Sequence, residues 1–285
     1  WECPEKIDLH ALDQLTWLIS IVCKVAAARG VIEIPLKNGE RLSGKLHEAW
    51  NTESLKCLIS TLDLKDAYKQ FGIHKDDRCK SVVSLKRLDG KGTTHYVMNC
   101  LPFGASSSVH NFNRIGRMIW AIGVTELRLP WVNYFDDYPI LTPSEISAST
   151  MAAAKGMLKL LGFGFAENKL EPFATSAEVL GVVVDCGLVS EGKLVYAMKE
   201  SRRQEALSAI EDILDKGAVT PCLLPSVLGR LQFADGQLAG RTGKLAMADI
   251  RSLGLHSKSS VSLDSDARVA LQMLKERFMD NRPRT

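Results

Sequence analysis

Two adjacent aspartates lie between two apolar, strand-like runs in the stretch LPWVNYFDDYPILT, residues 129–142. The residues around Asp136 and Asp137 favour burial, and an isolated buried carboxylate is unfavourable by several kcal/mol unless a positive charge pairs with it. Two alternatives follow for this pair. It is either a solvated, inert hairpin tip or a site where something positive, such as a metal ion, binds.

The composition is that of an ordinary globular protein. The 285 residues, 46% of them hydrophobic and 24% charged, allow a substantial core in one large domain or two smaller ones. The net charge of +3 neither requires nor excludes nucleic acid. A local excess of basic residues extends from Lys65 to Lys91, although most such runs are solvated surface.

Cysteine usage and hydropathy indicate an intracellular protein. Seven cysteines without a CxxC pair predict neither a zinc site nor a disulfide framework and favour a reducing compartment. The apolar run LTWLISIVC ends at Lys24 and is too short to span a bilayer, and no secretory pattern precedes it. We therefore expect a protein of the cytoplasm or nucleus that is not secreted and has no membrane partner.

Periodicity and turn residues predict both strands and helices. A hairpin is expected over 31–46, turning at Asn38-Gly39 as a type I′ turn. Further strands are expected over 57–64, 80–87, 94–101 and 178–185. Two more are expected directly before and directly after the aspartate pair. Helices are expected over 4–29, 104–123, 144–162 (with Ser144 as N-cap and Gly162 as its stop), 202–216, 226–238, 244–253 and 264–279.

Without the strand pair at 80–100, the order from Cys57 to Asp185 is β-α-β-β-α-β, the ferredoxin-like or split βαβ plan. Its central strands are adjacent and antiparallel, so Asp63 is expected beside the Asp136-Asp137 turn. Many unrelated proteins share this plan. Pro139 lacks an N–H group, which predicts that the outgoing strand is a sheet edge or is kinked there.

If Asp63, Asp136 and Asp137 converge, they form an oxygen-only, negatively charged cluster. Hard cations of the Mg²⁺ type suit such ligands. Two such ions about 3.5–4 Å apart form the clamp used in phosphoryl transfer. The cluster therefore predicts a metal site.

Five ordered motifs resemble those of reverse transcriptases. LDLKDAYKQ (62–70), LPFGASSS (101–108) and YFDD (134–137) resemble the palm motifs, LGFGFAENK (161–169) and EVLGVVVD (178–185) the next two, and the helices after Lys199 a thumb. The resemblance covers roughly residues 30–250. It implies an α+β fold, a polymerase right hand with a ferredoxin-like palm, fingers and a helical thumb. The expected domains are an N-terminal helix with part of the fingers (1–56), a palm with a fingers insertion at about 72–100 (57–198), and a helical thumb or connection (199–285).

The resemblance implies RNA-directed DNA synthesis with Mg²⁺, for which Mn²⁺ can substitute. A primer 3′-hydroxyl would attack the α-phosphate of a dNTP on an RNA or DNA template. The implied metal ligands are Asp63, Asp136 and Asp137. Lys169 matches the lysine near the leaving pyrophosphate, although it also reads as a surface lysine after a helix stop.

The resemblance also assigns residues to the nucleotide and to the template and primer. Asp66 and Ala67 would face the triphosphate, and Tyr68 would be a steric gate against the 2′-hydroxyl, unless it is simply a core tyrosine. Phe103 and Gly104 would lie near the incoming nucleotide, although a Pro-Phe-Gly turn also starts a helix. Contacts with template or primer are implied for Ser106, Ser107, Tyr134, and for Leu180 and Gly181 in a hairpin that steadies the primer end.

Some features remain open at this point. The triphosphate grip of the fingers has no firm motif match, only Lys37, Arg41 and Lys45 around the first hairpin. Residues 225–245 are similar to the post-palm region of retroelement polymerases of the LTR or tyrosine-recombinase type, whose ribonuclease H and integrase or recombinase domains would lie beyond this chain in a longer polyprotein. The alternatives are an inactive, polymerase-derived nucleic-acid-binding protein and an unrelated palm-like nucleotidyltransferase or cyclase.

Overall fold

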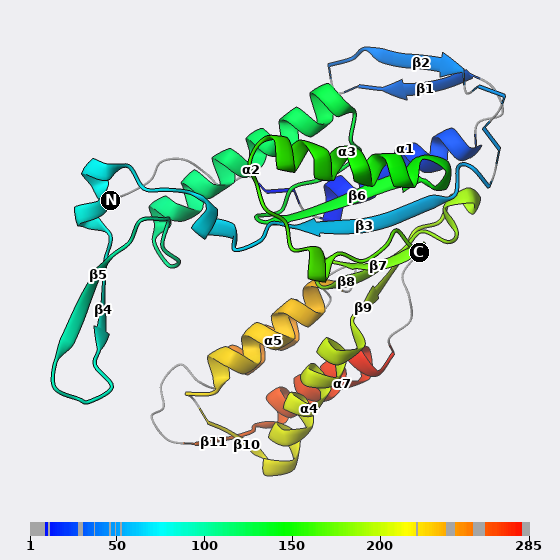
Figure 1. The fold of residues 1–285 in the computed structure, drawn as a ribbon. Coiled ribbons are helices and arrows are strands. Elements are labelled where there is room, and N and C mark those ends of the chain that lie inside the picture. The colour runs from blue at the N-terminus through cyan, green and yellow to red at the C-terminus, as the bar shows by residue number, and fades with distance from the viewer. Residues whose placement is uncertain are drawn as a thin grey trace. The chain divides into compact units, whose positions relative to one another are not determined.

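The computed structural model describes residues 9–10, 12–27, 31–36, 38–45, 47–48, 50–51, 53–220, 222–237, 243–252 and 260–280. The chain divides into two compact units, Trp1–Thr175 with Val189–Gly192 and Ser176–Leu188 with Lys193–Thr285. Helices and strands are both present in each unit (Figure 1), as expected for the α+β class. The predicted domain boundaries at 56/57 and 198/199 stay predictions. Within the described ranges, no helix has the length and apolar character needed to cross a membrane.

The first unit is built on an antiparallel strand pair. Strand β3 (Cys57–Asp63) pairs with β6 (Asp137–Pro143) along its whole length, and helices α2 (Ser106–Leu127) and α3 (Ser147–Leu160) lie over the pair (Figure 1). Buried side chains from all four elements form one hydrophobic cluster. Helix α1 (Leu12–Ala27) adds the buried Leu15 and Ile19. Burying this apolar surface is what holds the strand pair in place.

Two hairpins and several short 3₁₀ helices complete the first unit. Strands β1 (Val31–Pro35) and β2 (Arg41–Lys45) form one hairpin, and β4 (Val82–Lys86) and β5 (Thr93–Val97) form the other. The 3₁₀ helices are η1 (Ala67–Gln70), η2 (Lys75–Lys80), η3 (Ser144–Ile146), η4 (Glu167–Lys169) and η5 (Val189–Glu191). The predicted strand pair at 80–100 is thus confirmed, with Gly90 at positive φ in its turn.

The first hairpin exists, but its predicted type I′ turn is wrong. Leu36 N–H donates to Glu40 O at 2.7 Å and Gly39 N–H donates to Leu36 O at 3.1 Å, so the closing pair is Leu36–Glu40, whereas a two-residue loop at Asn38-Gly39 would close one residue nearer the turn. Gly39 has a φ of 85°. A three-residue loop places its left-handed residue last, which Gly39 satisfies.

Helix α2 continues past Gly123, where it was predicted to end. A β-carbon at Gly123 would lie 2.2 Å from Cζ2 of Trp131, so this glycine lets the indole ring pack directly on the helix. The helix ends at Arg128, whose φ is 54° and whose N–H donates to Gly123 O. The glycine therefore serves close packing rather than helix termination.

Helix α3 starts differently from the prediction and ends as predicted. Ser144 is not its N-cap, because the Ser144 hydroxyl donates to Glu53 O at 2.7 Å and a 3₁₀ turn, η3, precedes the helix. Gly162, at a φ of 82°, follows its end, and its N–H donates to Lys159 O.

Pro139 lies inside β6, and the register continues past it with Thr61 opposite. Its carbonyl accepts from Val132 N–H at 3.0 Å, so the backbone polar groups of this residue point away from β3. The missing N–H therefore removes no bond from the β3–β6 ladder. It weakens pairing with residues 130–134, which form isolated bridges instead of the predicted strand. β6 is thus an edge of its two-stranded sheet, as the proline predicted.

The second unit joins a three-stranded sheet to a helical cluster. Its sheet has the order β7 (Ser176–Val179), β8 (Val182–Asp185), β9 (Val195–Met198). The predicted single strand over 178–185 is therefore a hairpin, and Leu180 and Gly181, with φ of 52° and 77°, form its type I′ turn. In the first unit, the second edge of β3 is bridged by Ala174, opposite Ile59.

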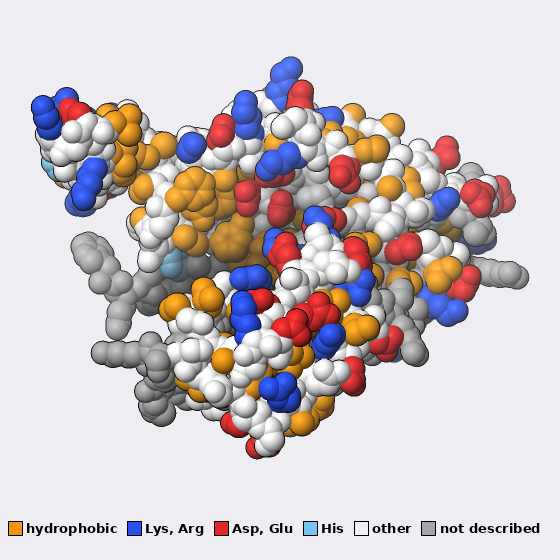
Figure 2. Space-filling view, turned by 90° about the horizontal axis from the view of Figure 1, so that it is seen from below, with side chains coloured by type: hydrophobic (Ala, Val, Ile, Leu, Met, Phe, Trp, Pro, Cys, Tyr) orange, Lys and Arg blue, Asp and Glu red, His pale blue; other side chains and the backbone are white. Residues whose placement is uncertain are grey.

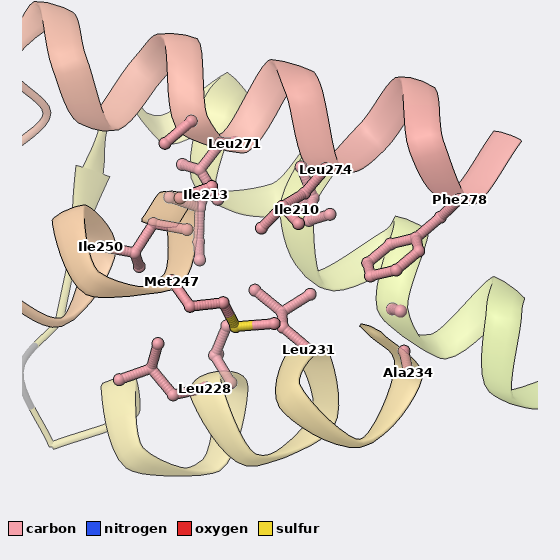
Figure 3. Packing of buried hydrophobic residues seen from close by; sticks show 14 of the residues in the cluster. Ile210, Ile213, Leu228, Leu231, Ala234, Met247, Ile250, Leu271, Leu274 and Phe278 are labelled. Carbon is pink, nitrogen blue, oxygen red and sulfur yellow. The ribbon is translucent and has the colours of Figure 1, made fainter. Parts of the chain in front are cut away.

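The predicted C-terminal helices are confirmed as α4 (Glu200–Lys216), α5 (Leu224–Gln237), α6 (Lys244–Ser252) and α7 (Ser265–Met279). Their apolar faces form a second core, in which Leu231, Met247 and Leu271 point toward one another (Figure 3). Two short strands, β10 (Ala218–Val219) and β11 (Val261–Ser262), pair beside it.

The packing of Trp131 on Gly123 predicts a large effect of one added methyl group. Gly123→Ala is expected to lower the free energy of unfolding by about 3 kcal/mol, because the β-carbon overlaps a buried ring that cannot move away. Gly156→Ala in α3 is the matched control, since a β-carbon at Gly156 would have open space around it. The control should be neutral or up to about 1 kcal/mol more stable. Urea unfolding measures both, and equal midpoints would contradict the packing argument.

Candidate active site

The β3–β6 register brings together the three aspartates predicted to converge. Asp63, the last residue of β3, lies directly opposite Asp137, the first residue of β6. Leu64, the residue after β3, is hydrogen-bonded to Asp136, the residue before β6: Leu64 N–H donates to Asp136 O at 3.0 Å. The three aspartates therefore lie together at one end of the strand pair.

Asp136 lies in a two-residue turn. Tyr134 and Asp137 exchange N–H···O bonds of 2.9 and 3.0 Å, and Phe135 and Asp136 are the central residues. Phe135 has a φ of 51°, whereas Asp136 does not have a positive φ. Positive φ at the first central residue alone is typical of a type II′ turn, where glycine is the usual residue. A phenylalanine there indicates that its surroundings hold the backbone.

Burial and mutual repulsion dominate the electrostatics of the pair. Burial raises the pKa of Asp137 to about 6, and the charges of Asp136 and Asp63 act in the same direction. Burial also raises the pKa of Asp136, to which the charge of Asp63 contributes, while its own backbone hydrogen bond lowers it. The site thus holds more negative charge than its surroundings neutralise.

Lys169 supplies a positive charge at this site. Its Nζ contacts Asp63 Oδ2, and this hydrogen bond raises the pKa of Lys169. Lys169 belongs to η4, and the loop before it is tied to β3 because Ala166 N–H donates to Asp63 O at 2.8 Å. The lysine that was predicted at the site from its motif therefore lies beside the first aspartate.

The donor set suits a divalent cation in its chemistry. Carboxylate oxygens are the ligands that Mg²⁺ prefers, and a cation would relieve the repulsion that raises the pKa values of the pair. Among the described residues, no group of three or more His, Cys, Asp or Glu side chains has the arrangement that would hold a metal ion. Lys169 also competes for Asp63 Oδ2. The residues thus fit the ion in ligand type and charge, but their side chains do not have the arrangement that would hold it.

An aromatic shelf adjoins the carboxylates. The Tyr68 ring stacks on Phe112 with centroids 4.5 Å apart and contacts Phe103 at 4.9 Å. Burial raises the pKa of Tyr68, and so does the charge of Asp136, which indicates that the two side chains are close. The Phe103 side chain is 65% exposed, so it has a free surface for a further planar group.

The backbone before Tyr68 is unusual. Asp66 and Ala67 both have positive φ, of 56° and 35°, and within the described ranges no acceptor contacts their N–H groups. Gly104, with a φ of 87°, precedes the first turn of α2, where Ser106 and Ser107 are exposed. Unpaired N–H groups in such a turn suit an anion.

Other predicted residues lie elsewhere. Leu180 and Gly181 belong to the β7–β8 turn of the second unit. Arg41 pairs with Glu33 at 3.2 Å, Lys45 is exposed on β2, and Lys37 lies outside the described residues. No triphosphate grip is identified from these three.

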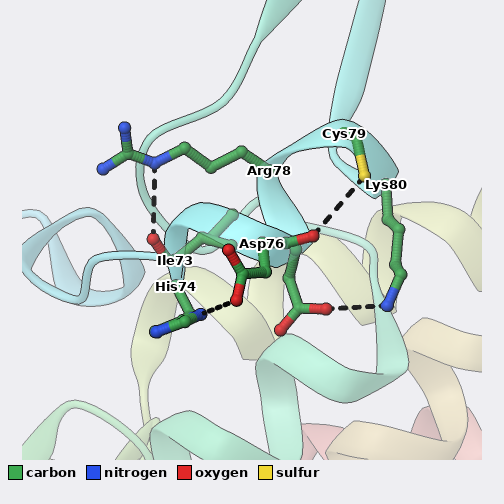
Figure 4. A network of polar contacts seen from close by, with 7 residues as sticks. Ile73, His74, Asp76, Arg78, Cys79 and Lys80 are labelled. Carbon is green, nitrogen blue, oxygen red and sulfur yellow. Dashed lines mark hydrogen bonds and ion pairs between the residues drawn. The ribbon is translucent and has the colours of Figure 1, made fainter.

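The basic run from Lys65 to Lys91 is partly neutralised by local pairs. Lys80 of η2 pairs with Asp77 at 2.7 Å (Figure 4), and Arg87 pairs with Asp89 at 3.4 Å. The following β4–β5 hairpin has both hydrophobic and basic side chains at its surface, at the left of Figure 2. Its exposed hydrophobic residues are Val82, Leu85, Leu88, Tyr96 and Val97.

Sequence reasoning missed Gln70, which lies within the first motif. Its side-chain amide donates to Gly164 O at 2.9 Å and accepts from Gly164 N–H at 2.7 Å. This pair joins the loop after β3 to the loop that carries Lys169. A glutamine in η1 gives no sequence signal for a partner 94 residues away.

Comparisons with known proteins agree with this arrangement. The sequence model of the family described as reverse transcriptase (RNA-dependent DNA polymerase) matches residues 19–184. No curated protein sequence matches the chain. Solved structures of the foamy viral protease-reverse transcriptase are similar to it at 16% identity.

The three solved structures differ in the share of each chain that is covered. The dRH form with double-stranded DNA has a TM-score of 0.58 and covers 97% of this chain and 49% of that one. The match to the RNA/DNA hybrid complex has a TM-score of 0.57 and covers 88% of this chain and 33% of that one. The double-stranded DNA complex has a TM-score of 0.55 and covers 96% and 58%. This chain thus spans 33% to 58% of those solved chains, and the likeness confirms the predicted polymerase fold.

The raised pKa of Asp137 predicts a pH-dependent stability. The folded-state pKa of about 6 lies above the usual 3.8, so the native state disfavours the carboxylate. Stability is therefore lost as the pH rises from about 4 to about 6, and the penalty is fully present above that range. Asp137→Asn stays neutral and should raise the free energy of unfolding in EDTA by about 1–2 kcal/mol near pH 8, after allowance for partial exposure.

Chemical denaturation near pH 8 and near pH 4.5 measures this difference. The gain should be clearly smaller at the lower pH, where the native carboxyl is already protonated. A gain of the same size at both pH values would show that the substitution acts through packing instead.

Proposed function

The chain belongs to the reverse transcriptase family, and we propose that it is the RNA-directed DNA polymerase core of a retroelement. It would add dNTPs to a primer 3′-hydroxyl on an RNA or DNA template. The observation that carries this proposal is the pairing of Asp63 with Asp137 at the end of β3–β6, with Asp136 in the adjoining turn. Inside a cell, element RNA and dNTPs occur in the cytoplasm and nucleus, so we propose that the protein acts there.

Asp63, Asp136 and Asp137 would hold two Mg²⁺ ions, with Mn²⁺ as a substitute. When bound, such ions lower the pKa of the attacking hydroxyl and neutralise charge on the transferring phosphoryl group. The buried strand pair keeps the carboxylates at fixed positions. Their raised pKa values favour the binding of positive charge.

Lys169 would act on the leaving group. Its ammonium already lies beside Asp63, so it is close to where pyrophosphate would form. A lysine at that position holds a proton that can neutralise the developing charge or transfer to the leaving oxygen.

The aromatic shelf would select the sugar. Stacking on Phe112 restrains the Tyr68 ring, and a 2′-hydroxyl on the incoming nucleotide would collide with it. The N–H groups of Asp66 and Ala67 would bind triphosphate oxygens, and Phe103 and Gly104 would contact the nucleotide.

Template and primer are the proposed nucleic-acid partners. The exposed Ser106 and Ser107 would meet the template, and Tyr134 and the Leu180-Gly181 turn would meet the primer. The predicted palm (57–198), the fingers insertion and the thumb (199–285) remain part of this proposal. The foamy viral relatives were solved with double-stranded DNA and with an RNA/DNA hybrid, which supports nucleic acid as the partner. Ribonuclease H and integrase or recombinase domains of an LTR or tyrosine-recombinase element would be neighbours in a longer polyprotein.

Primer extension tests the carboxylate assignment. Asp136→Asn is expected to reduce dNTP incorporation on an RNA template by at least about 10²–10³-fold, because it removes a charged ligand. Asp76→Asn, an exposed aspartate paired with His74, is the matched control and should retain activity. Full activity of Asp136→Asn would remove it from the site. Salt-sensitive RNA binding by the unsubstituted chain, without incorporation in either Mg²⁺ or Mn²⁺, would instead identify a protein that only binds nucleic acid.

The proposed sugar gate has a separate test. Tyr68→Val should raise the ratio of ribonucleotide to deoxyribonucleotide incorporation by about 10- to 100-fold, because the smaller side chain leaves room for a 2′-hydroxyl. Tyr96→Val on the exposed face of β5 is the control. An unchanged ratio for Tyr68→Val would exclude Tyr68 as the gate.

A further inference from the structure

The turn that carries Asp136 contains a backbone conformation that its own sequence does not favour. Phe135 has a φ of 51°, in the left-handed region that bulky residues rarely adopt. Such a residue keeps this conformation only where neighbouring groups hold it. The carbonyl of Phe135 belongs to the peptide that joins it to Asp136, so whatever holds this carbonyl also sets the direction of Asp136.

Asn133 contacts that carbonyl. Its side chain is fully buried, with 0% exposure, and its Nδ2 donates to Phe135 O at 2.9 Å. A β-carbon at Gly116 of α2 would lie only 3.4 Å from the same Nδ2, so the amide is packed closely against the helix. A donor that reaches two residues along the chain in this way stabilises a turn that the backbone alone does not favour.

The backbone of Asn133 is itself fixed by a residue from the N-terminal part of the chain. Asn133 N–H donates to His10 Nδ1 at 3.0 Å, and His10 N–H donates to Asn133 O at 3.1 Å. The His10 ring contacts Trp120 edge-on, with centroids 4.6 Å apart. Trp120 and Trp131 in turn donate to each other's carbonyls at 2.9 and 3.1 Å. The backbone of Asn133 is therefore linked to α2 through His10 and Trp120.

We propose that Asn133 is a positioning residue of the polymerase site, which holds Phe135 in the left-handed conformation and thereby directs the Asp136 carboxylate. This inference rests on the proposed function. The role requires a short amide: alanine has no donor, and an ionised aspartate would present an acceptor to the Phe135 carbonyl. His10 supports the role by fixing the Asn133 backbone.

A double-mutant cycle separates positioning from simple packing. Asn133→Ala should lower kcat for dNTP addition by about 10- to 100-fold, as expected for a displaced reacting group, with a smaller change in the KM for dNTP. Glycine adopts positive φ without a side-chain penalty. In a Phe135→Gly background, the same Asn133→Ala substitution should therefore change kcat only a few-fold.

The matched control is Asn113→Ala. Asn113 is a buried asparagine of α2 whose side-chain amide has no hydrogen-bond partner among the described residues, so its loss should leave kcat within a few-fold of the unsubstituted chain. The same cycle is measured on the thermal unfolding midpoint in EDTA. Asn133→Ala should lower this midpoint by several degrees with phenylalanine at 135 and by clearly less with glycine there.

Equal losses from Asn133→Ala in both backgrounds, in kcat and in the midpoint, would overturn the proposal and identify Asn133 as a packing residue. No loss in either background would overturn it as well. If the unsubstituted chain incorporates no dNTP, the proposed function fails, and the midpoint cycle still decides whether Asn133 holds the turn.

Discussion

The antiparallel register of β3 and β6 is the constraint on which the site depends. Asp63 and Asp137 face each other because the two strands pair from Cys57–Pro143 to Asp63–Asp137 without a bulge. A slip of one residue would turn every side chain of one strand to the opposite face, and the carboxylates would no longer meet. The proline in β6 does not threaten this register, since its missing donor would have faced residues 130–134.

The register also creates an electrostatic problem that the chain solves only in part. Three carboxylates converge at a half-buried strand end, where the surrounding protein screens charge poorly. Lys169 neutralises part of Asp63, but Asp136 and Asp137 remain mutually repelling, and their pKa values are raised. Such a site lowers the stability of the native chain and favours the binding of positive charge. Perturbed carboxyl groups of this kind are typical of functional sites.

Local patterns predicted most of the secondary structure, and the inferred strand order correctly placed Asp63 beside the Asp136-Asp137 turn. The apolar, β-rich run CLISTLDL, the periodicity of the later helices and each single motif depend on residues close in sequence, so one chain is enough to read them. The errors occurred where contacts outside the local sequence pattern decide. The close packing of Trp131 on α2 requires a glycine at position 123. The Ser144 hydroxyl, expected to cap α3, donates to the Glu53 carbonyl instead. Because Pro130 and Pro139 lack N–H groups, residues 130–134 form isolated bridges instead of the predicted strand. The hydrogen-bonded pair Leu36–Glu40 sets the length of the loop in the first hairpin.

The supports of the candidate site were the least predictable, because none of them belongs to a charge or metal pattern. Gln70 contacts Gly164 across 94 residues, and Asn133 contacts His10 across 123. The Gln70 amide contacts the backbone of Gly164, and the backbone N–H of Asn133 donates to His10 Nδ1, so the neighbouring sequence carries no signal for either contact. Yet the aspartate motif alone cannot hold a phenylalanine at positive φ. The carboxylates are readable from sequence because their chemistry is specific, whereas the groups that fix their geometry become visible only when the fold brings them together.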